Sequence, residues 1–104
     1  MEGKGSGKRE ALMISLDLVT TVPAEDTSVA ELESALAAHI ENMIEKDFNR
    51  LLHLLYRIDV SEEKLKTALA ATAEPAGRII ADLIIERQLQ KISFRKSYRE
   101  GKGF

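Results

Sequence analysis

The C-terminal stretch KISFRKSYR (residues 91–99) spaces basic and aromatic side chains in a way that could bind a polyanion. The positive charges come from four residues: Lys91, Arg95, Lys96 and Arg99. Phe94 and Tyr98 lie between them, where aromatic rings could stack on nucleic-acid bases. Such a patch would bind weakly and with a strong salt dependence. The alternative is that these cations only complement the helix dipole and solvate an exposed helix end.

The charge of the whole chain disfavours a polyanion as the main partner. The 104 residues carry 15 Lys and Arg against 17 Asp and Glu, a net charge of −2. Residues 11–85 sum to −7, whereas residues 86–104 sum to +4. Because the acidic body repels the polyanion that the basic end attracts, we keep nucleic-acid binding as the alternative function.

Residue types that support catalysis or metal binding are sparse. The chain has no cysteine, which excludes thiolate catalysis, disulfides and cysteine zinc sites. Neither His39 nor His53 has an acidic residue three positions before it, as carboxylate-bridged metal sites in helical bundles require. The stretch GKGSGK departs from the phosphate-loop pattern, which needs Gly where Glu2 stands and Ser or Thr where Arg9 stands. We therefore predict no cofactor, no metal and no catalytic residue.

Helical spacing dominates residues 28–99, so the elements that position these side chains are helices. Ser28 and Glu31 have the spacing of a capping box at the start of a long helix that we expect to run to Ile58. Its predicted inward stripe is Ile40, Ile44, Phe48, Leu51, Leu55 and Ile58. Ser61 caps a short second helix, EEKLKTALAA, and Pro75 precedes a third helix that reaches about Tyr98. The LLHLL match to groove-docking helices falls on core positions of the first helix.

Residues 1–27 are predicted to form an extended N-terminal arm, and residues 100–104 a frayed tail. The first eight residues are rich in glycine and polar side chains. Apolar residues then alternate with their neighbours with a period of two: Leu12, Ile14, Leu16 and Leu18. That period is typical of a strand, which would pair with a second copy or lie over the helices.

The third helix is apolar on two faces, one of which contains Ile85, Leu89 and Ile92. A helix with two apolar faces must be covered on both. The first helix covers one face, and a second chain is the simplest cover for the other, which predicts a dimeric helical bundle. The competing arrangement is a monomer whose own N-terminal arm folds back over Ile85, Leu89 and Ile92.

Two charged residues border the apolar stripes at similar heights of an antiparallel helix pair. Asp47 lies 11 residues before Ile58, and Arg87 lies 12 residues after Pro75. We hypothesise that Asp47 and Arg87 form an ion pair that sets the register of the two long helices.

Two stretches, LLYRIDVSEEKL and IIERQ, resemble a group of short, uncharacterised bacterial helical proteins. The resemblance covers roughly residues 41–96 and implies a bacterial cytoplasmic protein, without any site residue or activity. Two further features favour cytoplasmic localisation. The sequence has no apolar run of the roughly 20 residues that a membrane span needs. Asp17 also interrupts the short apolar run that a signal peptide would require.

The sequence thus predicts an all-α protein with an antiparallel pair of long helices, one short helix and an extended N-terminal arm. The leading function is a non-catalytic interaction or structural protein whose partner is a second copy of itself or another protein. Weak nucleic-acid association through the basic helix end is the alternative, and no membrane association is expected.

Overall fold

The computed structural model describes the backbone of residues 3–20, 24 and 26–99, and the side chains of residues 7–20, 24 and 26–95. The described chain forms five helices: α1 (Gly3–Val19), α2 (Val29–Lys46), α3 (Phe48–Ile58), α4 (Glu62–Ala71) and α5 (Ala76–Arg99). No strand is present among these residues, which confirms the all-α prediction. The predicted tail, residues 100–104, lies outside the described residues.

The prediction of an extended arm is wrong for residues 3–19, which form α1. Ala11, Leu12, Leu16 and Val19 share one helical face and are buried in the core. Leu12 and Leu16 are four residues apart, a spacing that puts two side chains on the same side of either a strand or a helix. The alternating pattern therefore could not distinguish the two. Helix packing decides the outcome, because α1 lies against both α2 and α5.

Polar contacts also fix α1 beside α2. Lys8 forms an ion pair with Glu33 of α2. The Arg9 guanidinium donates to the Thr27 carbonyl, 2.6 Å away, just before α2 begins. Ser15, a buried polar residue of α1, donates its hydroxyl to the Ala11 carbonyl at 2.7 Å, which satisfies that hydroxyl inside the core.

The predicted capping box starts α2. Ser28 Oγ accepts from the Glu31 backbone N–H at 3.1 Å, and the Ser28 backbone N–H donates to the Glu31 carboxylate at 3.0 Å. Four residues of α2 are buried: Leu32, Leu36, Ile40 and Met43. They form the centre of the core together with Leu12, Leu16 and Ile84.

The predicted single helix from Ser28 to Ile58 is divided in two at Asp47. Asp47 leaves the helical region, with φ −153° and ψ 68°, and its carboxylate accepts from the Arg50 N–H at 3.2 Å to cap α3. The division changes which side chains face inward. Phe48, predicted to lie on the inward stripe, is 52% exposed on the surface.

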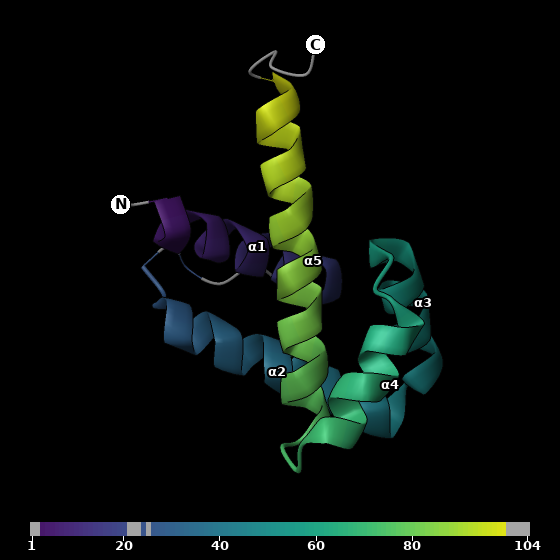
Figure 1. Cartoon of the computed structure of the whole chain (residues 1–104). Helices are drawn as coiled ribbons and strands as arrows, with labels where there is room; N and C mark the ends of the chain where they lie inside the picture. The colour runs from purple at the N-terminus through teal and green to yellow at the C-terminus, as the bar shows by residue number, and fades with distance from the viewer. Residues whose placement is uncertain (1–2, 21–23, 25, 100–104) are drawn as a thin grey trace.

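Helix α5 crosses both α1 and α2 instead of lying antiparallel alongside one of them, as Figure 1 shows. Its far end projects beyond the other helices, while α3 and α4 lie to one side of it (Figure 1). The first turn of α5 is held against α2, because the Gly77 N–H donates to the Glu41 carboxylate at 2.8 Å. A Cβ at Gly77 would overlap Glu41 Cγ and lie 2.8 Å from the Ala37 carbonyl oxygen, so only glycine fits this approach.

Candidate functional site

The face predicted to form an oligomer contact is covered within the single chain. Ile85 is 5% and Ile92 is 8% exposed, and both belong to the core that α1 completes. Leu89 is half-buried, and a Cβ at Gly7 of α1 would lie 3.5 Å from Leu89 Cδ2. The N-terminal segment therefore covers this face, as the competing monomer arrangement required, but does so as a helix.

The two residues predicted to pair with each other have other contacts. Arg87 Nη2 lies 3.3 Å from Asp59 Oδ2, and Asp47 caps α3. The break at Asp47 redirects α3, so that Asp59, at the end of α3, meets α5. The structure thus gives Arg87 a different acidic partner from the predicted one.

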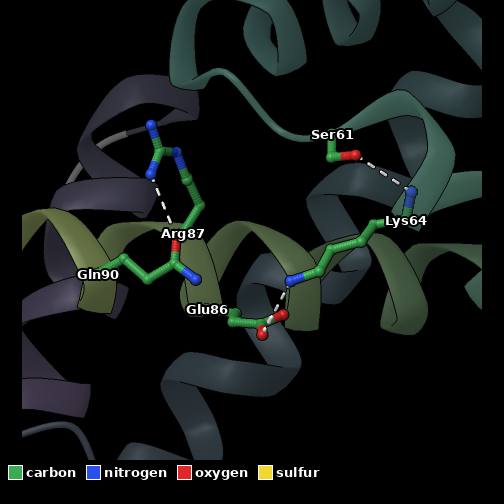
Figure 2. Close-up of polar contacts among 5 residues, drawn as sticks. All are labelled: Ser61, Lys64, Glu86, Arg87 and Gln90. Carbon is green, nitrogen blue, oxygen red and sulfur yellow. Dashed lines mark hydrogen bonds and ion pairs between the residues drawn. The ribbon is translucent and has the colours of Figure 1, made fainter.

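Arg87 lines a cleft of about 220 Å³ between the α3–α4 turn and α5. Figure 2 shows five of the lining residues: Ser61, Lys64, Glu86, Arg87 and Gln90. Arg87 Nη1 donates to the Gln90 amide oxygen at 3.1 Å, and Lys64 Nζ pairs with a Glu86 carboxylate oxygen at 3.4 Å. Arg87 Nε is buried without a hydrogen-bond partner.

The polar groups of this cleft already have structural roles. Asp59 neutralises Arg87, and Glu86 neutralises Lys64. Ser61 Oγ accepts from the Lys64 backbone N–H at 3.2 Å, as the N-cap of α4. The arrangement ties the α3–α4 turn to α5 through partly exposed ion pairs, each worth about 0.2–1 kcal/mol.

The outer face of α3 carries a row of exposed apolar side chains, which we name the α3 ridge: Phe48, Leu52 and Tyr56. Their exposed fractions are 52%, 45% and 88%. They follow one another at four-residue spacing, so they lie along one side of the helix. The side of α3 that faces the core buries Leu51, Leu54, Leu55 and Ile58. Sequence reasoning missed the ridge because it assigned Phe48 to the core; the four-residue spacing after Asp47 was the available signal.

The predicted nucleic-acid patch lies at the projecting end of α5 (Figure 1). Lys91 is half-buried and Arg95 is exposed, one turn apart on the helix. Phe94 is 72% exposed beside them. The side chains of Lys96 and Arg99 lie outside the described residues.

The carboxyl group of Asp82 on α5 has a perturbed acidity. Partial desolvation raises its pKa above the ordinary value, and the Glu33 and Glu74 carboxylates add to the rise, while Arg78 opposes it. Arg78 Nε lies 3.8 Å from Asp82 Oδ1. Since the Asp82 side chain is 59% exposed, water screens these interactions and their energetic effect is small.

Comparisons with known proteins found no protein-family model, curated protein or solved structure that matches this chain. Within the described residues, no three His, Cys, Asp or Glu side chains gather as metal ligands would. None of the helices there combines the length and apolarity needed to cross a bilayer. Large apolar or aromatic side chains are exposed on the surface of α3 and at the end of α5.

Proposed function

We propose that the protein is a non-catalytic helical interaction protein that self-associates, with the α3 ridge as its contact surface. The observation that supports this is the exposure of three large apolar side chains in a row on one short helix. Burying a side chain of this kind completely contributes about 1.5–3 kcal/mol. Much of that free energy can still be gained when a partner buries Phe48, Leu52 and Tyr56.

A second copy is the occupant that the α3 ridge fits, because the ridge is symmetric about Leu52. Phe48 lies four residues before Leu52, and Tyr56 lies four residues after it. A two-fold interface brings one patch against itself and so requires a self-complementary surface. When two α3 helices pair antiparallel about Leu52, each Phe48 ring faces the Tyr56 ring of the second copy, and offset aromatic pairs are favourable.

The size of the ridge indicates a weak dimer. Buried aromatic side chains each cover about 150–250 Å². Because Phe48, Leu52 and Tyr56 are only 52%, 45% and 88% exposed, together they can supply roughly half of the about 800 Å² per partner in a standard interface. Flanking residues of α3 would supply the rest, and the extent of assembly would depend on protein concentration.

Sedimentation velocity over a wide concentration range tests the proposal. The wild-type chain is expected to move from its monomer mass of 11.6 kDa toward twice that value as concentration rises. The double variant Leu52→Ser with Tyr56→Ser should stay monomeric. Leu69→Ser, which removes a comparable exposed leucine on α4, should assemble like the wild type. A wild-type chain that is monomeric at millimolar concentration, or a ridge variant that still dimerises, would reject the proposal.

Weak nucleic-acid association remains the second candidate function, supported by the exposed Phe94 ring next to Arg95 at the projecting helix end. The test is binding of a single-stranded oligonucleotide at 50 and 200 mM salt. Binding should fall steeply with salt and should be weakened by Arg95→Gln. Absence of binding at 50 mM salt would remove this candidate.

A further inference from the structure

A second surface of α3 combines positive charge with an apolar floor. The C-terminal end of α1 and the side of α3 form a groove of about 150 Å³. Its apolar lining comes from both helices and from α2: Leu18, Val19, Met43 and Leu54. Its polar lining consists of Arg50, His53 and Arg57, which share one side of α3 at spacings of three and four residues.

The two arginines of this groove, Arg50 and Arg57, carry positive charge that no carboxylate of the described residues neutralises. Arg87, Lys64 and Arg78 each have a carboxylate within 4.0 Å. Among the described residues, neither Arg57 nor His53 has such a partner. Arg50 donates to the Val19 carbonyl at 3.4 Å, at the C-terminal end of α1, which orients its guanidinium at the groove. A protein with a net charge of −2 thus keeps two exposed arginines on this side of α3, with the His53 side chain beside them.

The chemistry of the lining decides which anion fits. Its floor consists of aliphatic and thioether side chains, which suit an apolar side chain better than a stacked nucleic-acid base, and His53 supplies the ring of the lining. A volume of about 150 Å³ accommodates one medium apolar side chain rather than a long acyl chain. A carboxylate next to that side chain would reach Arg57 and His53 at the edge of the groove, where Arg–carboxylate pairs form directional hydrogen bonds.

We propose that this groove between α1 and α3 binds an acidic peptide segment, with one aliphatic side chain on the floor and neighbouring carboxylates on Arg57 and His53. The proposal does not depend on the α3 ridge, because the ridge occupies a different side of α3. The partner of the groove is therefore an acidic segment of another protein. Self-association uses Leu52 and its neighbours instead.

Fluorescence anisotropy with short labelled peptides tests this directly on the full chain. The probe is a seven-residue peptide of alternating glutamate and leucine. A lysine–leucine peptide serves as the control for charge, and a glutamate–serine peptide as the control for the apolar floor. We expect the glutamate–leucine peptide to bind most tightly and its affinity to fall between 50 and 200 mM salt, since exposed ion pairs are screened.

Variants of the chain locate the binding. Arg57→Gln should weaken the Kd by about two- to fivefold, the range expected for one exposed ion pair. Lys66→Gln, which removes an equal charge on α4 outside the groove, should leave the Kd unchanged. The Leu52→Ser variant with Tyr56→Ser should also bind normally, which separates this site from self-association.

Three results would overturn the proposal. The first is no binding of the glutamate–leucine peptide at millimolar concentration. The second is an equal loss of affinity in Arg57→Gln and Lys66→Gln, which would mean that only the overall charge matters. The third is tighter binding of a single-stranded oligonucleotide than of the peptide, with the same dependence on Arg57, which would assign the groove to nucleic acid.

Discussion

Gly77 is the residue where backbone geometry most directly constrains the sequence. Because a Cβ there would overlap Glu41 Cγ and approach the Ala37 carbonyl, Gly77→Ala must push α5 away from α2. We expect a loss of about 1–3 kcal/mol in the free energy of unfolding, the usual cost of overpacking. Urea denaturation measures it.

Gly7→Ala is the matched control. A Cβ at Gly7 would meet Leu89 Cδ2 at 3.5 Å, an ordinary van der Waals distance, in the interior of α1. Alanine should therefore stabilise the chain by roughly 0.5–1 kcal/mol through its better helix propensity. Equal effects of the two substitutions would contradict the close approach at Gly77.

Asp59 combines a backbone and a charge requirement. It ends α3 with φ 70°, in the left-handed region, and its carboxylate pairs with Arg87. Asn tolerates this region better than most residues, so Asp59→Asn should lose only the exposed ion pair, less than about 1 kcal/mol. Asp59→Ala should lose a further 1–2 kcal/mol, roughly, from backbone strain. Thermal unfolding of both variants would show the difference, and equal losses would exclude the strain.

The raised pKa of Asp82 should make the free energy of unfolding depend slightly on pH. Its pKa is raised in the folded state, so the folded state holds this proton more tightly than the unfolded state. The stabilisation that comes from this tighter proton binding is therefore fully present below the pKa of Asp82 in the unfolded chain. It is lost as the pH rises through the pKa of Asp82 in the folded chain. Asp82→Asn should become the more stable protein near neutral pH, by less than about 0.5 kcal/mol because the side chain is largely exposed. Urea denaturation at pH 3 and pH 7 should show the difference only at pH 7.

At the scale of elements, the docking of α1 on α5 matters for both the stability of the fold and the burial of the apolar face of α5. Leu12 of α1 is fully buried in the core, so Leu12→Ala should cost about 2–5 kcal/mol. Met13→Ala, at a half-buried neighbouring position, should cost clearly less. Loosened docking of α1 should also uncover Ile85 and Ile92 and increase binding of an apolar fluorescent dye. No increase in dye binding would mean that another element covers this face.

Local signals predicted the helices well where a helix has its own cap. Ser28 with Glu31, and Ser61 with its following acidic residues, start helices that the structure contains. The α2–α3 break was not predicted, because Asp47 interrupts an otherwise continuous apolar spacing without any proline or glycine. Helix α1 was missed because its decisive contacts are tertiary ones with α2 and α5, which its own residues do not encode. The Asp59–Arg87 pair and the α3 ridge follow from the same break, so they could not be predicted without it.

At the scale of the whole molecule, the structure changes the reason for expecting assembly. The sequence suggested that Ile85, Leu89 and Ile92 need a second chain, yet α1 largely covers them within one chain. The apolar surface left exposed on α3 is a single row of three side chains, so any dimer should be in equilibrium with folded monomer. The monomer should therefore fold on its own, which an obligate dimer would not do.

This equilibrium predicts how thermal stability depends on concentration. If two copies associate through Phe48, Leu52 and Tyr56, binding of the second copy stabilises the folded state by mass action, so Tm should rise with protein concentration. The rise should begin only where the dimer is populated, since the monomer is itself stable. In the Leu52→Ser variant with Tyr56→Ser, Tm should be independent of concentration, because unfolding would be unimolecular. A concentration-dependent Tm in that variant, matching the wild type, would place the contact elsewhere on the molecule and leave the α3 ridge without a role in assembly.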